Sequence, residues 1–469
     1  MKKLISTVTA VVITAAMLTS CSTAGSTSTT TASTKEQAVS ENSIQSSAES
    51  SETETETDES ASSSTNRQDF SGVSIEMLNT KSEIQSQLED AAKQWSELTG
   101  ATLEVYTIGS GSPSQEISAR YAANNAPALI MGDIQDIVDV SSENAVDLSD
   151  QSWAENGGTK YGYSADGKLY SFPFCIEARG LMYNKTVIEE TLGESWDPSS
   201  ITNLDDFKAL LDKLVAAGMT SPVALNAEDW SNAGHYFTLV YEEQDGTLEG
   251  AESFINGLKD GSQTLSENAR FNSLMDTYDV LMAYNINKDD PLAADYDENA
   301  ADLAEGEIAF WFNGNWAWAE ISDYIEDDTQ LGIMPVVQND TEGNANVNSY
   351  LAGSASKHIM VDKTCNDEQQ QAAAKDFLDW LVNTPEGVKV MVEDCSLVPP
   401  FSNITEEANN DLGISVQQYS NAGQLFPGVT DYPGDHWSTV GAIMQKYLGG
   451  QIDRTEFANE VQAYWETQE

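Results

Sequence analysis

The feature that most constrains the fold is the alternation of strand-like and helix-like segments at the start of a long globular region. Strands are predicted at 73–78, 102–106 and 128–131. Between the first two, 84–98 repeats apolar side chains at helical spacing, and a second helix is predicted from Pro113, a residue favoured at a first helical position. Strand, helix, strand, helix, strand is the order of a parallel sheet covered by helices, so the sequence predicts an α/β domain.

The same pattern recurs further along the chain. Strands are predicted at 181–183, 223–225, 308–312 and 331–334, and helices around 202–214, 271–281, 369–382, 385–393, 437–447 and 454–465. Ser82 with Gln85 resembles a capping box, and Thr202 is predicted to cap its helix. The region 69–469 spans about 400 residues, more than one hydrophobic core usually supports, so two lobes are expected.

The N-terminal segment predicts export. Lys2 and Lys3 precede an apolar run, 4–17, which ends in the sequence Leu-Thr-Ser-Cys21. This is the pattern of a secretory signal, and its end resembles the lipobox that leaves Cys21 lipid-modified. Ordinary secretion with a chance cysteine is the alternative. Residues 22–68 are rich in Ser, Thr and Glu and are predicted to form a disordered tether between the lipid anchor at 1–21 and the domain at 69–469.

The charge and the cysteines exclude several classes of function. The formal net charge of −54 disfavours nucleic acid as a partner through repulsion. Apart from Cys21, the chain has Cys175, Cys365 and Cys395. A Cys365–Cys395 bridge is possible outside the cytoplasm, but unpaired thiols are favoured. No metal-ligand spacing occurs, and neither a metal nor a cofactor is predicted.

Motifs of catalysis are missing. The three histidines stand outside any HExxH pattern, and the sequence has neither a GxSxG elbow nor a phosphate-binding GxxxxGK[ST] loop. A pair of carboxylates could cleave glycosides, but the 76 acidic residues single out no pair. We therefore expect a binding protein rather than an enzyme.

Three tryptophans stand beside polar side chains in loop-like settings. Trp230 follows Asp229, Trp316 follows Asn315, and Trp437 comes two residues after Asp435. A flat apolar face next to hydrogen-bonding groups suits a sugar, whose C–H face leaves water against a ring while its hydroxyls need directional partners. Trp318 and Trp380 are interpreted as core residues.

Ordered motifs along the chain resemble those of a known family. Residues 170–185 read Tyr-Ser-Phe-Pro-Phe-Cys-Ile-Glu-Ala-Arg-Gly-Leu-Met-Tyr-Asn-Lys, residues 313–316 read Asn-Gly-Asn-Trp, and Leu-Val-Pro-Pro ends at Pro400. The chain resembles the extracellular solute-binding lipoproteins of sugar ABC importers (family 1) and, more distantly, maltose-binding protein. This resemblance implies a type II periplasmic-binding-protein fold, with lobe 1 at about 69–175 and 337–382, lobe 2 at about 177–334 and 386–469, and a ligand cleft between them.

The resemblance also implies roles for single residues. Trp316 matches the main stacking platform, Trp437 a second aromatic, and Glu177 a hinge carboxylate that accepts sugar hydroxyls. Trp230 with Asp229 falls near an aromatic and acidic pair of the second lobe. The chain departs from the family at 127–133, where an aspartate and a first-lobe aromatic are absent; polar contacts from Asp133, Gln135 and Asp136 are expected there instead.

The resemblance leads to a functional expectation with alternatives. A monomer anchored on the outer face of the bacterial membrane captures a carbohydrate, an oligosaccharide by preference, and delivers it to a membrane permease. The same fold could instead bind a peptide, a polyamine or another cationic solute. An anchored glycan-active enzyme and a purely adhesive surface protein are the remaining alternatives.

Overall fold

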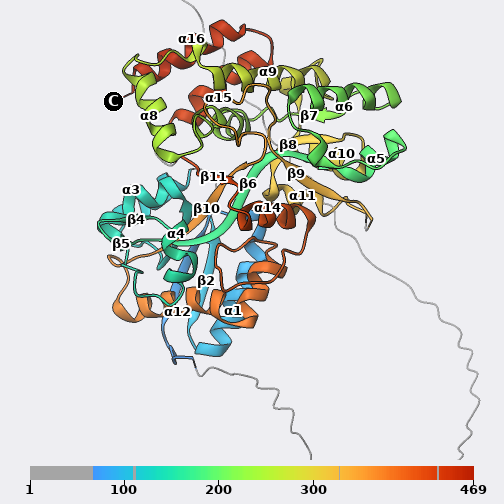
Figure 1. Ribbon diagram of the computed structural model, residues 1–469. Coiled ribbons are helices and arrows are strands. Elements are labelled where there is room, and N and C mark those ends of the chain that lie inside the picture. Colours follow the sequence, from blue (N-terminus) through green and yellow to red (C-terminus); the bar gives the residue numbers. More distant parts are fainter. Residues whose placement is uncertain (1–66, 109–111, 327, 430–431, 469) are drawn as a thin grey trace, which may run out of the picture. The chain divides into compact units, whose positions relative to one another are not determined.

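A nine-stranded mixed sheet runs through the described part of the protein (Figure 1). The computed structural model describes residues 67–108, 112–326, 328–429 and 432–468, all in one of the two units into which the chain divides, Thr65–Glu469. Cys21, the signal segment and the tether up to residue 66 lie outside the described residues.

Two long strands join the parts of the sheet. The strands are β1 (Ser74–Asn79), β2 (Thr102–Thr107), β3 (Leu129–Asp133), β6 (Phe172–Asn184), β7 (Val223–Ala224), β8 (Phe310–Gly314), β9 (Leu331–Met334), β10 (Leu351–Val361) and β11 (Leu425–Phe426), with β4 (Ser164–Ala165) and β5 (Lys168–Leu169) in a separate hairpin. Their order is β2-β1-β3-β10-β6-β8-β7, with β11 beside β10 and β9 beside β6. The predicted parallel pairing of β1 with β2 and β3 is confirmed, whereas β10 is antiparallel to both β3 and β6.

Helices cover the faces of this sheet. They are α1 (Gln85–Thr99), α2 (Pro113–Ala122), α3 (Ile134–Asn144), α4 (Thr159–Tyr161), α5 (Lys185–Leu192), α6 (Leu204–Ala217), α7 (Leu239–Glu242), α8 (Leu248–Lys259), α9 (Ala269–Tyr284), α10 (Tyr296–Glu305), α11 (Trp318–Ile321), α12 (Glu368–Asn383), α13 (Pro385–Lys389), α14 (Asp411–Asn421), α15 (His436–Leu448) and α16 (Arg454–Glu466). We call the part built on β1–β3, α1–α3 and α12 the first lobe. The part built on β7–β9, α5–α10, α15 and α16 is the second lobe.

Helix starts follow the sequence at some places and differ at others. Ser112 caps α2 as the proline after it predicts. The prediction of a capping box at Ser82 is wrong. A 3₁₀ turn, Ser82–Ile84, precedes α1, and the side-chain oxygen of Gln85 accepts a 3.0 Å hydrogen bond from Asn79 Nδ2 instead. The cap of α6 is Asn203, one residue after the predicted Thr202, because the Asn203 side chain accepts from the backbone N–H of Asp206.

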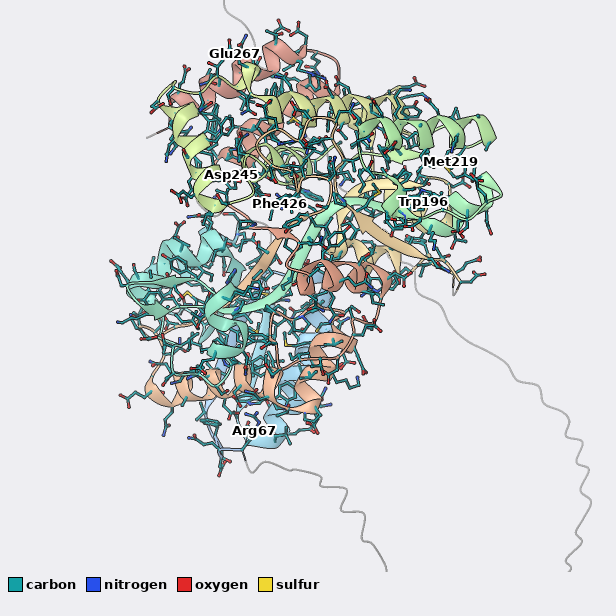
Figure 2. All side chains as sticks on the ribbon, viewed as in Figure 1. Arg67, Trp196, Met219, Asp245, Glu267 and Phe426 are labelled. Carbon is teal, nitrogen blue, oxygen red and sulfur yellow. The ribbon has the colours of Figure 1, made fainter. Side chains whose placement is uncertain are left out.

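Each lobe has its own hydrophobic core. In the first lobe α1 and α12 bury Trp95, Phe377 and Trp380 against one face of the sheet, while Ile117 and Ile137 of α2 and α3 pack on the other. At the end of this lobe, Arg67, labelled in Figure 2, is bound to α12 by an ion pair with Asp376 at 2.9 Å. The expectation that Trp380 is a core residue is confirmed, since its side chain is fully buried.

Strand β6 belongs to both lobes. Its Phe172 and Phe174 lie in the first-lobe core, whereas Leu181 and Tyr183 lie in the core that α6, α9, α15 and α16 form in the second. The residues between them, Ile176 and Ala178, join a third cluster with Trp311. One strand therefore anchors in both cores, which suits a crossover at which the lobes meet.

The predicted lobe boundary near 386 needs a correction. Val390, Met391 and Leu397 follow α13 and are buried in the first-lobe core, although the segment from 386 onward is predicted to belong to the second lobe. Helix α13, which precedes this segment, packs closely on α12, since a Cβ atom on Gly387 would stand 2.0 Å from the carbonyl oxygen of Trp380. The rest of the predicted division stays a prediction.

The cysteines are unpaired in the described residues. Cys175, Cys365 and Cys395 are all free thiols, as favoured from the sequence. Cys395 lies in the main first-lobe core, and Cys365 packs against a different cluster. Within the described ranges no helix combines the length and apolar character of a membrane span, and no group of His, Cys, Asp and Glu side chains is arranged to hold a metal ion.

Candidate ligand-binding site

Three of the predicted tryptophans meet around one histidine of the second lobe. The imidazole of His235 lies with its centroid 4.6 Å from the ring of Trp316, 5.2 Å from Trp230 and 6.2 Å from Trp437. The four residues come from three distant segments of the chain. We call them the His235 cluster. The structure thus brings together the aromatic side chains that the sequence predicts.

Two glycines make room for the large rings. A Cβ atom on Gly314 would stand 2.2 Å from Cζ3 of Trp316, and one on Gly234 would stand 2.8 Å from Cε2 of Trp437. Both distances are far below a normal contact, so the indole rings lie directly on glycine backbone. Trp316 stands on the 3₁₀ turn Asn315–Ala317, which follows β8. The Asn315 side chain accepts a 2.9 Å hydrogen bond from the backbone N–H of Ala178 and so ties this turn to β6.

The second element of the site is an ion pair between the first lobe and β6. Lys81 Nζ lies 2.6 Å from Glu177 Oε1 and 2.6 Å from Glu83 Oε1. The side chains of Lys81 and Glu177 are only 5% and 10% exposed. Asn79 positions this lysine, since its side-chain oxygen accepts from the Lys81 backbone N–H at 2.8 Å.

Both partners of this pair are charged. Burial alone would raise the pKa of Glu177, but Lys81, with smaller contributions from Ser356 and Lys357, holds that pKa below its usual value. Burial would lower the pKa of Lys81, but Glu177, Cys175 and Glu83 together hold it well above the usual value. The predicted hinge carboxylate is therefore an ionised hydrogen-bond acceptor at the crossover.

A cavity of about 270 Å³ lies between these elements. Its walls come from both lobes, from β6 and from the segment after α13, and include Lys81, Glu83, Glu177, Asn315, Trp316, Trp318, Asp323, Asp394 and Leu397. This volume is near the lower end of small-molecule sites, which run from about 300 Å³ upward. Trp316 belongs to both the cavity and the His235 cluster, so the two features are continuous.

Two further predicted residues, both carboxylates, have partners elsewhere in the second lobe. Asp229 accepts from the backbone N–H of Trp230 and packs against Gly441 of α15. Asp435 accepts from the hydroxyl of Tyr464 at 2.9 Å, which ties the start of α15 to α16. Among the described residues neither carboxylate lines the cavity, and their roles as sugar contacts stay predictions.

The polar first-lobe segment is also occupied by internal contacts. Asp136 accepts from the backbone N–H of Asp133 at 3.0 Å and closes the capping box of α3. Burial, helped by the neighbouring charge of Asp133, raises the pKa of Asp136 to about 6. Asp133 pairs with Lys357, and Gln135 donates to Asp139. No residue of 133–136 lines the described cavity.

Sequence reasoning missed three residues of the site. Trp318, interpreted as core, is only partly buried and lines the cavity, which corrects that expectation. Lys81 is separated from Glu177 by 96 positions, so no local pattern connects them. His235 joins Trp230 because Trp230–Phe237 is a π-helix. An α-helix would place residues five apart about 140° from each other, and the wider turn of a π-helix brings them together.

Two lobes that share crossover strands, with a cavity lined from both, define a two-lobe binding protein. The chain belongs to the family of bacterial extracellular solute-binding proteins, whose sequence pattern matches residues 80–387. A curated relative is a maltooligosaccharide ABC transporter solute-binding lipoprotein of Streptococcus pneumoniae serotype 4, 21% identical over 387 residues, which are 80% of this chain and 84% of the relative. The multiple sugar-binding protein of Streptococcus mutans is 22% identical over 271 residues, 52% of this chain and 58% of that protein.

Solved structures share the fold. RafE in complex with raffinose superimposes with a TM-score of 0.69 at 17% identity, covering 84% of this chain and 99% of that one. A sugar transporter protein of Bacillus licheniformis in complex with stachyose has a TM-score of 0.61 at 19% identity, covering 84% and 99%. The predicted two-lobe α/β fold and the predicted family are therefore confirmed.

Proposed function

We propose that this protein captures an oligosaccharide outside the cytoplasm and delivers it to the permease of an ABC importer. The observation that carries the proposal is the His235 cluster, in which Trp230, Trp316 and Trp437 converge beside a cavity that also contains the Lys81–Glu177 pair. Indole faces accept the C–H side of a sugar ring, and charged oxygen and nitrogen atoms bind its hydroxyls. Relatives named for maltooligosaccharides and multiple sugars support the same ligand class.

The lipid anchor and the permease partner belong to this proposal. A cysteine at the end of a secretory signal would carry acyl chains and hold the domain at the outer face of the membrane. The relative from Streptococcus pneumoniae is itself named a lipoprotein of an ABC transporter. Mass spectrometry of the chain purified from bacterial membranes tests the anchor, since lipidation adds the mass of the acyl groups to a peptide beginning at Cys21.

A glycoside-cleaving activity fits this site less well. Glycosidases need one carboxylic acid that keeps its proton near neutral pH. The buried carboxylate of the cavity wall, Glu177, has the opposite property, because its pKa is held below the usual value by Lys81 against the effect of burial. We infer that the site binds its ligand without covalent chemistry.

A cationic solute is a second candidate, and the charges of the cavity favour it. The wall contains the carboxylates of Glu83, Glu177, Asp323 and Asp394 but, among the described lining residues, only one ammonium group, that of Lys81. A polyamine or basic peptide would be attracted to such a wall. The three converging tryptophans favour the sugar over this alternative.

A thermal-shift screen separates the two candidates. The full chain is heated with maltotriose, raffinose, stachyose and triacetylchitotriose, and with spermidine and trilysine alongside. A ligand that binds the native state raises the melting temperature in proportion to the logarithm of its concentration. We expect a shift with at least one glycan, whose mass is unchanged afterwards. Shifts with the amines alone would replace the sugar by a cationic ligand.

A further inference from the structure

The histidine at the centre of the aromatic cluster has hydrogen-bonding capacity that the protein does not use. Nδ1 of His235 is buried without a partner, and the described residues provide no hydrogen bond to either ring nitrogen. Buried polar atoms are nearly always paired in folded proteins, so an unpaired one asks for a ligand or another explanation. If this side chain only packed against the tryptophans, the apolar ring of a phenylalanine would fill the same role as the imidazole.

The backbone around His235 is fixed. Its carbonyl oxygen accepts a 2.8 Å hydrogen bond from Arg179 Nε on β6. The guanidinium of Arg179 also donates to Glu242 at 2.6 Å and to Thr238 at 2.8 Å, so the crossover strand and the π-helix are tied together. A π-helix is rare and occurs frequently at functional sites. This segment therefore holds the imidazole at one place between the tryptophans.

The imidazole is neutral at physiological pH. Burial, reinforced by the positive charges of Arg179 and Lys357, holds the pKa of His235 well below its usual value. A neutral imidazole has one N–H donor and one acceptor nitrogen. This is the combination that a sugar hydroxyl, itself donor and acceptor, can match without bringing a charge into the aromatic environment.

A second histidine shows how a purely structural residue differs. His436 also lies among aromatic rings and has a buried Nδ1 without a partner, but its Nε2 contacts the Tyr241 hydroxyl at 3.2 Å. His436 is fully buried. His235 is partly exposed, stands 4.6 Å from the ring of the cavity residue Trp316, and has neither nitrogen engaged.

We propose that His235 is a specificity-determining contact of the ligand, whose imidazole forms a hydrogen bond with a hydroxyl group of the sugar that stacks on Trp316. The inference rests on the proposed function, because it names a recognition group of the same site. If the inference holds, the protein binds glycans that carry a free hydroxyl group facing His235 more tightly than glycans that lack this group.

Calorimetric titration of the full chain with raffinose, stachyose, maltotriose and triacetylchitotriose tests the inference. His235→Phe keeps a flat ring between the tryptophans and removes both nitrogens, and His235→Gln keeps a donor and an acceptor. For the glycan that the wild type binds, we expect at least a tenfold loss of affinity in His235→Phe and a smaller loss in His235→Gln. The matched control, His436→Phe, should bind within about twofold of the wild type. Equal affinity of wild type and His235→Phe would overturn the role of His235 and leave the proposed function in place.

An NMR measurement on the wild-type protein tests the same inference if His235→Phe does not fold. The chain has three histidines, so ¹⁵N-histidine spectra contain few ring signals. We expect the bound glycan to move the nitrogen shifts of His235 and to leave those of His436 in place. Binding without any change at His235 contradicts the inference. If the wild type binds none of the four glycans, the proposed function fails first, and the inference fails with it.

Discussion

The two walls of the site use different physics. The second-lobe wall is aromatic, with Trp230, Trp316 and Trp437 around a neutral His235. The wall formed by the first lobe and β6 is ionic, with Lys81 between Glu83 and Glu177. The aromatic wall can bind a ligand by apolar contact and by its shape. In the ionic wall the charged groups are already paired with one another, so a ligand can form hydrogen bonds there only with the atoms that the ion pair leaves free.

The difference separates stability from affinity. The indole rings of Trp316 and Trp437 pack on glycine backbone with one face, and the other face is available to a ligand. Replacing such a tryptophan should therefore reduce ligand affinity more than it reduces the stability of the fold. A buried ion pair depends on both members, and removing one leaves an uncompensated charge at the crossover. We therefore expect changes in the ionic wall to act first on the fold and changes in the aromatic wall to act first on the ligand.

The largest effect should come from breaking the ionic wall. In Lys81→Met, Glu177 keeps its charge in a buried place without a partner, and we expect a loss of roughly 3–5 kcal/mol in the free energy of unfolding. Denaturant titration measures this loss. The double variant Lys81→Met/Glu177→Gln removes both charges and should recover most of the stability. A single variant within about 1 kcal/mol of the wild type would show that the pair is screened by water and that the contrast between the walls is false.

The next effect belongs to the aromatic wall. Trp316→Ala removes the ring shared by the cavity and the His235 cluster, and we expect the affinity for the bound glycan to fall at least tenfold, or about 2 kcal/mol at a central anchor. Trp316→Phe keeps a smaller face and should lose less. Calorimetry measures the affinity, and circular dichroism checks that the domain remains folded. An unchanged dissociation constant in Trp316→Ala would remove this ring from the site.

Much of the fold could be predicted from the sequence, but one of its two crossover strands could not. In the first lobe, the strands β1–β3 and the helices α1, α2 and α12 follow local periodicity, which one sequence displays directly, whereas α3 is not among the predicted helices. Strand β10 reads Leu-Ala-Gly-Ser-Ala-Ser-Lys-His-Ile-Met-Val and has small residues where a predictable strand has branched or aromatic ones. It is a strand because β3 and β6 pair with it on both sides, so tertiary pairing overrides a weak local preference.

The site shows the same division. The residue types of Trp316 and Glu177 and their flanking motifs identify them in the sequence. The partner of Glu177 does not stand out, because Lys81 is one lysine in a polar turn until the fold places it 2.6 Å from the carboxylate. His235 is hidden for a different reason, since its side chain reaches the tryptophans only through a π-helical turn that sequence periodicity does not indicate.

A smaller effect tests the first-lobe segment by pH. The pKa of Asp136 is raised to about 6 from 3.8, so between these values the folded state holds a proton that the unfolded state releases, and the stability falls as the pH rises through this window. Asp136→Asn keeps an oxygen that can accept from the Asp133 backbone and removes the titration. We expect the variant to gain on the order of 1–2 kcal/mol over the wild type at pH 7.5 and almost nothing near pH 3.5. Denaturant titration at the two pH values measures the difference, and an equal gain at both would assign it to packing instead of charge.

The smallest effect concerns the outer ring of the aromatic wall. The side chain of Trp437 is 41% exposed, more than that of the other cluster members, although its inner face rests on Gly234. Trp437→Ala should therefore weaken glycan binding by only about 1 kcal/mol, or roughly fivefold. Leu98→Ala is a matched control, because Leu98 is another exposed apolar residue, 59% exposed on the first-lobe helix α1, and its loss should leave the affinity unchanged. We expect the loss of Trp437 to weaken the binding of longer glycans more than that of short ones, because Trp316 lines the described cavity and Trp437 does not. An equal loss for all lengths would mean that Trp437 acts by supporting His235 and not by touching the ligand.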